Sequence, residues 1–155
     1  MNASIEKYLK AYNLVQFTGW LLALLILPAN LMAAFYIICV VQFLSLLEIL
    51  HAYKKWTQSS ALLCFLQIGA RLMILYFVHA LSIQFFIPSN HLFFTNDKIE
   101  TVAHIMFMAW CTAEIIRYAY YITELYKMQH DGLLWLRYTA FIICYPIGLI
   151  CELYI

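Results

Sequence analysis

The sequence has few charged residues, few glycines and few prolines for its length of 155 residues. Charged side chains make up 11% of the chain, against about 25% in an average soluble domain, and hydrophobic side chains make up 66%. A soluble domain of this size leaves roughly a third of its chain surface exposed, so this many apolar side chains cannot all lie in a core. Four glycines and three prolines exclude a collagen-like or low-complexity chain. The composition therefore indicates a polytopic membrane protein.

Neither a strong charge nor a cysteine motif is present. Nine Lys and Arg residues against eight Asp and Glu residues give a net charge of +1. Without a basic cluster to contact phosphates, we expect no nucleic-acid partner. The cysteines lie inside apolar runs without a C-x-x-C pair, so we expect small buried thiols, and no disulfide framework, zinc site or cofactor. They are Cys39, Cys64, Cys111, Cys144 and Cys151.

Five apolar runs approach the length of about 20 residues that a helix needs to cross a bilayer. They cover residues 12–32, 34–53, 60–81, 102–126 and 133–155. The runs are continuously apolar, and lipid offers no partner to open backbone groups, so they predict helices and not strands. The first run continues past Trp20 to Leu27, which favours a retained helix over a cleaved signal peptide. The expected fold is all-α, a polytopic transmembrane helix bundle of five spans forming one domain over residues 1–155.

Basic residues are distributed unevenly between the two ends of these spans. If the N-terminus lies in the cytoplasm, Lys98 is the only basic residue in the outside segments. The inside segments then hold Lys7, Lys10, Lys54, Lys55, Lys127 and Arg137. The positive-inside rule therefore predicts a cytoplasmic N-terminus. The longest outside loop, residues 86–101, contains the turn formers Pro88, Asn90, Asn96 and Asp97.

Few polar side chains lie inside the spans, and a charged one costs roughly 2.5–3.5 kcal/mol to insert. They are Glu48, Arg71, Glu114, Arg117 and Glu152, with Gln42 and Gln67. Gln67 shares a helix face with Arg71, and Glu114 is spaced to pair with Arg117. Two interpretations stay open. These groups form interhelical hydrogen bonds and ion pairs that hold the bundle together, or the inward-facing arginines bind an anionic ligand.

The last span carries a polar stripe. Tyr138, Tyr145 and Glu152 recur every seven residues, which returns a helix to nearly the same face. Tyr145 and Glu152 would be about 10 Å apart on a regular helix. Pro146 disfavours helical geometry at Tyr145, so we expect a kink there that brings the two groups closer. Gly148 leaves room for the close approach of a neighbouring helix.

A phenol and a carboxyl group on one stripe suit proton transfer. Apolar surroundings disfavour the charged form of Glu, which suits general acid–base work near neutral pH. Tyr can donate to, or accept from, an oxygen whose charge changes. The competing interpretation is a packed or interfacial Tyr145 and a Glu152 paired with an arginine. The spacing alone favours neither.

The last span also resembles the active-site helix of the very-long-chain (3R)-3-hydroxyacyl-CoA dehydratases, the protein-tyrosine-phosphatase-like membrane proteins. The resemblance rests on Tyr145-Pro146-x-Gly148-x-x-x-Glu152, preceded by Trp135-x-Arg137-Tyr138. Four earlier stretches resemble the preceding spans of that family in order. They are Tyr12-Asn13-Leu14-x-x-x-x-Gly19-Trp20, Leu46-Leu47-Glu48-Ile49-Leu50-His51, Gln67-x-x-x-Arg71 and Glu114-Ile115-Ile116-Arg117-Tyr118-x-Tyr120.

The resemblance implies the third step of fatty-acid elongation in the endoplasmic reticulum membrane. Water is removed from a (3R)-3-hydroxyacyl-CoA to give a trans-2-enoyl-CoA. The resemblance implies that Tyr145 and Glu152 carry catalysis, and it leaves open which is the acid and which is the base. We favour Tyr145 on the side of the C2 proton or thioester, and Glu152 as the acid that protonates the leaving oxygen. Residues expected to support the site or bind substrate are Arg71, Arg117, Arg137, Gly148, Gln67 and Glu48. The implied partners are the substrate, the lipid bilayer, and the elongase condensing enzymes and reductases of the same cycle.

The chain departs from that family in one respect. The family typically has a sixth span, whereas this chain ends three residues after Glu152, so we expect the last span to be lacking. The alternative function is therefore a catalytically inactive membrane scaffold or truncated family member.

Two further motifs are given less weight. Cys111 and Arg117 match the C-x5-R signature of phosphatases, but a membrane helix has no free amides to cradle phosphate, so phosphatase activity is not expected. His79 and His104 lie near the far ends of two spans, where we expect interfacial side chains in preference to haem or metal ligands.

Overall fold

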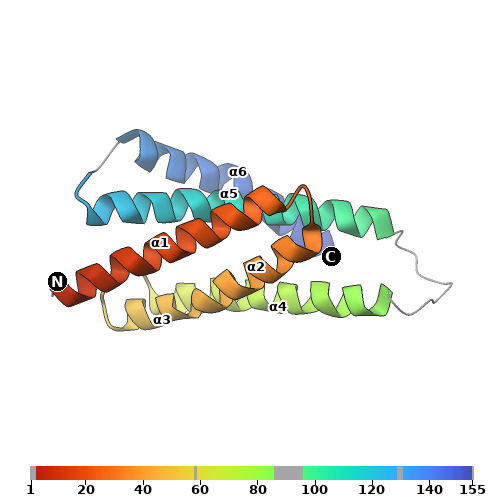
Figure 1. Ribbon diagram of the computed structural model, residues 1–155, viewed down its shortest axis with the longest axis horizontal. Helices are drawn as coiled ribbons and strands as arrows, with labels where there is room; N and C mark the ends of the chain where they lie inside the picture. The colour runs from red at the N-terminus through yellow and green to blue at the C-terminus, as the bar shows by residue number, and fades with distance from the viewer. Residues whose placement is uncertain (1–2, 58, 86–95, 129–130, 155) are drawn as a thin grey trace.

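The computed structural model describes residues 3–57, 59–85, 96–128 and 131–154. This part of the chain forms six α-helices and contains no β-strand (Figure 1). The helices are α1 (Ala3–Ile26), α2 (Leu31–Leu44), α3 (Leu46–Tyr53), α4 (Ala61–Phe85), α5 (Asn96–Leu125) and α6 (Asp131–Tyr154). The prediction of an all-α fold is confirmed.

A tight turn around Pro28 joins α1 to α2. α1 ends at Ile26, just before the proline, as expected of a residue that cannot donate a backbone hydrogen bond. Asn30 then begins α2, because its side chain accepts a hydrogen bond from the backbone amide of Ala33 at 2.9 Å. Such an N-cap satisfies one of the free amides of the first helical turn.

The predicted second span, residues 34–53, consists of two helices, α2 and α3, which meet at Ser45. The hydroxyl of Ser45 donates to the backbone carbonyl of Val41 at 3.0 Å, a contact that often bends helices. Ser45 is buried, so the junction lies inside the bundle.

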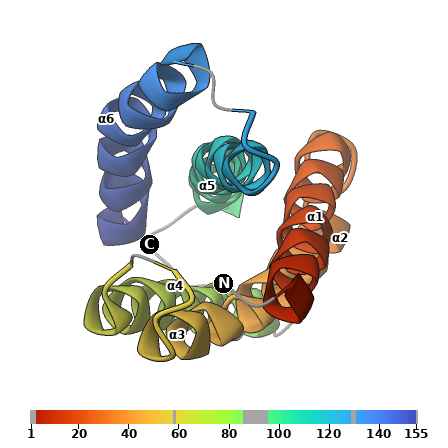
Figure 2. The same ribbon diagram turned by 90° about the vertical axis from the view of Figure 1, so that its left-hand side faces the viewer.

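α5 lies at the centre of the bundle. Seen from the end, it lies between α6 and α1, with α3 and α4 along a third side (Figure 2). The most deeply buried large apolar side chains belong to α5, α1, α2 and the turn after α1. They are Trp20, Leu27, Ile38, Met106, Phe107 and Tyr118. All five cysteines are free thiols.

Four helices of the described residues are long and apolar enough to cross a membrane. They are Ala3–Ile26, Leu31–Tyr53, Ala61–Ala80 and Asp131–Tyr154. α5 covers the fourth predicted span but is not among them, because charged side chains such as Glu114 and Arg117 interrupt its apolar residues. Its central position lets neighbouring helices, instead of lipid, surround those charges.

α5 also begins earlier than the sequence suggests. It starts at Asn96, inside the segment predicted as a loop over residues 86–101. The other turn formers of that loop, Pro88 and Asn90, lie outside the described residues.

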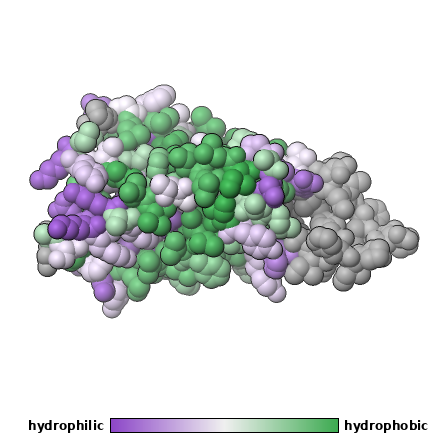
Figure 3. Space-filling model, in the orientation of Figure 1, coloured by the Kyte–Doolittle hydropathy of each residue, from purple (hydrophilic) through white to green (hydrophobic). Residues whose placement is uncertain are grey.

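The outer surface carries a broad apolar belt. Figure 3 shows apolar residues over the middle of the molecule and hydrophilic residues gathered at the end where the N-terminus lies. Large apolar side chains on the outer faces of α4 and α6 are exposed, among them Leu62, Phe65, Ile142 and Ile150. This surface is the one expected of helices that face acyl chains, so the helical membrane bundle is supported.

α1 and α2 approach closely at Gly19. A Cβ atom added to Gly19 would clash with a γ-methyl group of Val41 on α2. Glycine therefore fixes how near the two helices lie, as small residues do at helix interfaces in membranes.

Candidate active site

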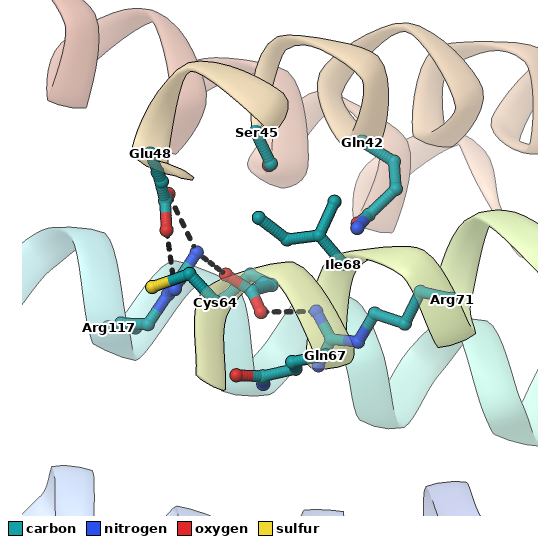
Figure 4. Close-up of a pocket in the computed structure, with 9 residues that line it drawn as sticks. Gln42, Ser45, Glu48, Cys64, Gln67, Ile68, Arg71 and Arg117 are labelled. Atoms are coloured by element: carbon teal, nitrogen blue, oxygen red, sulfur yellow. Dashed lines mark hydrogen bonds and ion pairs between the residues drawn. The ribbon is translucent and has the colours of Figure 1, made fainter. Parts of the chain in front are cut away.

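A narrow pocket lies between α2 and α3 on one side and α4 and α5 on the other (Figure 4). The pocket is small, with internal space for about one water molecule. Its lining consists of Gln42, Ser45, Glu48, Cys64, Gln67, Ile68, Arg71, Glu114 and Arg117. The charged and glutamine residues that the sequence points to inside the spans therefore meet at this one place, whereas Glu152 and the tyrosines of the last span do not line it.

Glu48 ties α3 to α5 and α1. Arg117 binds its carboxylate with both terminal nitrogens, Nη1 to Oε2 at 2.9 Å and Nη2 to Oε1 at 3.0 Å. The hydroxyl of Tyr118 donates to Oε1, and that of Tyr12 lies 3.4 Å from the same oxygen. A bidentate Arg–carboxylate pair with added hydrogen bonds is a strong and directional contact. Glu48 of α3 is therefore held by side chains of both α5 and α1.

Glu114 lies between the two arginines and is 2% exposed. Nη2 of Arg117 is 2.6 Å from its Oε2, and Nη1 of Arg71 donates to its Oε1. The predicted pairing of Glu114 with Arg117 along one helix is confirmed. The contact with Arg71, which comes from α4, was not foreseen. The dashed lines in Figure 4 follow the resulting chain of ion pairs.

This ionic chain is defined by Glu48, Arg117, Glu114 and Arg71, and its two carboxylates balance its two guanidinium groups. An anionic ligand entering the pocket would meet both carboxylates as well as both arginines. The structure therefore favours the interpretation in which these charges hold the bundle together. Removing one member would leave a buried charge uncompensated, which is strongly destabilising.

Glutamine side chains extend this polar region. Gln16 of α1 donates through Nε2 to the hydroxyl of Tyr12 at 3.0 Å and to that of Ser45 at 3.2 Å. Gln42 is buried, and its Oε1 has no hydrogen-bond partner among the described residues. Gln67 is exposed at the edge of the pocket, one turn before Arg71 on α4.

The two predicted catalytic groups lie on α6 in different surroundings. Tyr145 is 51% exposed, and its ring stacks on that of Phe141 with centroids 5.0 Å apart. Glu152 is half-buried, and its Oε1 accepts a hydrogen bond from Nε1 of Trp110 at 3.0 Å. Neither residue lines the pocket of Figure 4. The carboxyl group is thus tied to α5, whereas the phenol lies on the open side of α6.

α6 remains helical through Pro146. Gly148 is buried, and a Cβ atom there would lie 3.4 Å from Nε1 of Trp110 and 3.5 Å from its Cδ1. The neighbour for which this glycine leaves room is therefore the indole of Trp110.

Cationic side chains lie at one end of the bundle, and Arg137, near the start of α6, is one of them. Its guanidinium carbon lies 4.6 Å from the ring centroid of Tyr120 and 5.3 Å from that of Tyr121. Directly after α3, the ammonium nitrogen of Lys54 lies 4.9 Å from the ring centroid of Trp56. α6 begins and α3 ends at the same end of the bundle, where α1 begins (Figure 1).

The sequence motifs contain Tyr12 and Tyr118 without indicating their contacts, and they do not contain Trp110 or Gln16. Trp110 precedes Glu114 by four residues, and Tyr118 follows it by four, so all three share one helix face. That spacing is the signal that could have found Trp110 and Tyr118.

The C-x5-R motif and the two histidines make contacts typical of structural residues. Cys111 is buried in the middle of α5, and Arg117 on the same helix is paired with carboxylates. Nδ1 of His104 lies 2.9 Å from the backbone carbonyl of Glu100, one turn earlier, and the ring of His79 stacks on Phe35. Within the described residues, no three His, Cys, Asp or Glu side chains are grouped so that they could hold a metal ion.

A helical bundle with an apolar belt outside and a buried ionic chain inside defines an α-helical integral membrane protein. Residues 42–155 match the family described as protein tyrosine phosphatase-like protein, PTPLA, and the chain belongs to this family. The resemblance carried by its sequence motifs is confirmed.

The relatives that match the chain have consistent names. It is 27% identical over 161 residues to the "very-long-chain (3R)-3-hydroxyacyl-CoA dehydratase" of Caenorhabditis elegans, across 97% of this chain and 68% of the relative. It is 29% identical over 152 residues to the "probable very-long-chain (3R)-3-hydroxyacyl-CoA dehydratase" of Schizosaccharomyces pombe, across 92% and 68%. It is 31% identical over 157 residues to the "very-long-chain (3R)-3-hydroxyacyl-CoA dehydratase 2" of Mus musculus, across 94% and 57%. No solved structure matches the chain.

Proposed function

We propose that this protein is a very-long-chain (3R)-3-hydroxyacyl-CoA dehydratase, a hydro-lyase that converts its substrate to a trans-2-enoyl-CoA. The observation that carries the proposal is the match over 92–97% of the chain to relatives with that name, which reaches through α6 to Glu152. The half-buried carboxyl group of Glu152 adds support, because a carboxyl at membrane depth needs either a partner or a task.

The proposed mechanism is a β-elimination. The C2–H bond breaks and its electron pair forms the C2=C3 double bond, while the C3–O bond breaks and the hydroxyl group leaves as water. One proton passes from C2 to the base and one passes from the acid to the departing oxygen, so the two residues together neither gain nor lose a proton. A proton then returns from the base to the acid before the next turnover. Tyr145 acts on the side of the C2 proton and thioester, and Glu152 protonates the leaving oxygen.

The remaining site residues fall into two groups in this proposal. Arg71, Arg117, Glu48 and Gln67 form or border the ionic chain that fixes α3, α4 and α5 beside α6. Arg137 lies at the end of the bundle where α6 begins, with Lys54 and Lys55 beyond α3 at the same end. These cations are suited to hold the phosphate groups of CoA. The pantetheine arm then extends along the bundle and brings C2 and C3, next to the thioester, to Tyr145 and Glu152.

The cellular setting follows from the same proposal. The protein resides in the endoplasmic reticulum membrane with its N-terminus in the cytoplasm. Its substrate comes from the condensing enzyme and first reductase of the elongation cycle, and its product goes to a second reductase. Residues 1–155 act as one transmembrane dehydratase domain. The chain spans 68% of the length of the worm and fission-yeast relatives and 57% of that of the mouse relative.

The experiment that tests this function uses microsomes carrying the chain, offered a long-chain (3R)-3-hydroxyacyl-CoA. We expect enoyl-CoA above the level of an empty-vector control, and loss of that excess for Glu152→Ala. Equal product in the vector control and the wild type would contradict the enzymatic function and support the inactive-scaffold alternative.

A further inference from the structure

We propose that Trp110 is a positioning residue that fixes the carboxyl group of Glu152, an inference that rests on the proposed function. Trp110 is only 3% exposed and lies on α5, the central helix. Its Nε1 donates to Oε1 of Glu152 across the interface between α5 and α6 at 3.0 Å. This hydrogen bond ties the Glu152 side chain to α5.

The indole ring is held by groups on several sides. Gly148 faces it from α6 without a side chain, so the ring lies against bare helix backbone. The guanidinium carbon of Arg71 is 5.2 Å from the ring centroid, at cation–π distance. The ring of Phe107 meets it edge-on at 5.9 Å between centroids. The N–H bond of a ring held in this way points in one fixed direction. The Glu152 carboxyl group that accepts from it is therefore also held in one orientation.

The contact decides which carboxyl oxygen can carry the acidic proton. An oxygen that accepts the indole N–H bond acts as the carbonyl-type acceptor of a neutral carboxyl group. When Glu152 acts as the acid, its proton therefore resides on the other carboxyl oxygen, Oε2. Without the indole, the carboxyl group can rotate and present either oxygen, so fewer bound substrates meet a proton in the right place.

Arg71 connects this contact to the ionic chain. It pairs with Glu114 through its guanidinium group, while the same group lies over the Trp110 ring. Arg71 therefore helps to hold the Trp110 ring in place, and through that ring it helps to orient the Glu152 carboxyl group without touching it.

The test compares the purified wild type with Trp110→Phe and Trp20→Phe. Phe keeps an aromatic ring at position 110 but removes the N–H donor. Trp20 is the matched control, because it is fully buried and its Nε1 has no hydrogen-bond partner among the described residues. We expect Trp110→Phe to lower kcat by about tenfold or more with KM within about twofold, and Trp20→Phe to leave both near the wild-type values. Equal kinetics for the two variants would overturn the inference.

A double-mutant cycle with Glu152→Gln separates positioning from packing. If Trp110 acts through the Glu152 carboxyl, adding Trp110→Phe to Glu152→Gln causes no further loss of kcat. Full, independent losses from the two substitutions would show that Trp110 acts on packing and would overturn the inference.

A spectroscopic measurement keeps the inference testable if the chain has no dehydratase activity or if Trp110→Phe does not fold. The ultraviolet resonance Raman band of the indole N–H reports its hydrogen bonding. Glu152→Leu should shift the band of one of the four tryptophans toward the unbonded position. An unchanged spectrum contradicts the contact itself, whereas a shifted band without turnover contradicts only the dehydratase function.

Discussion

Glu114 shows how a carboxylate can be kept inside this bundle. It has almost no exposed surface, yet it contacts Arg117 on its own helix and Arg71 on α4. Two cations around one buried anion offset the loss of hydration, and Glu48 offsets the second positive charge. The side chain therefore links two helices through charge, in a part of the molecule where water cannot replace it.

Substituting Glu114 tests this role. Glu114→Gln keeps the shape but removes the negative charge, which leaves Arg71 and part of Arg117 unpaired in the interior. We expect the free energy of unfolding to fall by about 3–5 kcal/mol, measured by thermal or denaturant unfolding in detergent.

The matched control is Glu6→Gln. Glu6 and Lys10 form an ion pair at 2.7 Å near the start of α1, where water screens the charges, so little change in stability is expected. A similar, small effect for both substitutions would mean that the ionic chain does not hold the bundle together.

The sequence predicts some contacts between individual residues and misses others. The pairing of Glu114 with Arg117 follows from a spacing of three residues on one helix, which local geometry determines. The pairing of Glu48 with Arg117 joins residues 69 positions apart, so it depends on how α3 and α5 pack. The stripe that joins Tyr145 to Glu152 follows from helical periodicity, but the contact of Glu152 with Trp110 depends on which helix lies beside α6.

The helices themselves differ in how closely their sequences specify them. α1 and α4 follow from long apolar runs, and Pro28 and Asn30 mark the turn after α1. The division of the second span at Ser45 could not be predicted, because serine also occurs inside helices, where its hydroxyl bonds to a carbonyl of the preceding turn. The start of α5 at Asn96 was missed because Asn and Asp are read as turn formers, although they also begin helices.

The α1–α2 contact gives a prediction at the scale of elements. Gly19→Ala introduces a methyl group where the side chain of Val41 already lies, so the two helices must separate or Val41 must change rotamer. We expect a loss of about 1–3 kcal/mol in the free energy of unfolding. Adding Val41→Ala should restore part of it, because the smaller side chain makes room.

Gly69→Ala on α4 serves as the control for that experiment. A Cβ atom at Gly69 would have no neighbour within 4 Å, and alanine favours a helix over glycine, so no loss of stability is expected. If Gly19→Ala were equally harmless, or if Val41→Ala only added to its effect, the close approach of α1 and α2 would be contradicted.

At the scale of the whole molecule, the apolar belt and the polar end define a direction through the membrane. The hydrophilic residues in Figure 3 gather at the end where the N-terminus lies, and α3 ends and α6 begins at the same end. Lys54 and Lys55 follow α3 directly, so basic residues far apart in the sequence share this side. The sequence predicted the sidedness from charge alone, whereas the central position of α5 needed the packed bundle.

The expected orientation can be measured in sealed microsomes. A protease-cleavable tag placed before Met1 should be removed by protease added outside, because the positive-inside rule places this end in the cytoplasm. A tag that is protected until detergent opens the vesicles would contradict the orientation and the proposed access of CoA to this end.

The catalytic role of Tyr145 can be tested directly through the initial rate of dehydration by purified protein in lipid nanodiscs. The rate is compared between Tyr145→Phe and Tyr138→Phe. Both tyrosines lie on the exposed side of α6 and recur on one stripe, so the two substitutions remove the same hydroxyl group from similar surroundings. We expect a loss of about 10²–10⁴-fold for Tyr145→Phe and little change for Tyr138→Phe. Equal rates for the two variants would contradict the catalytic role of Tyr145.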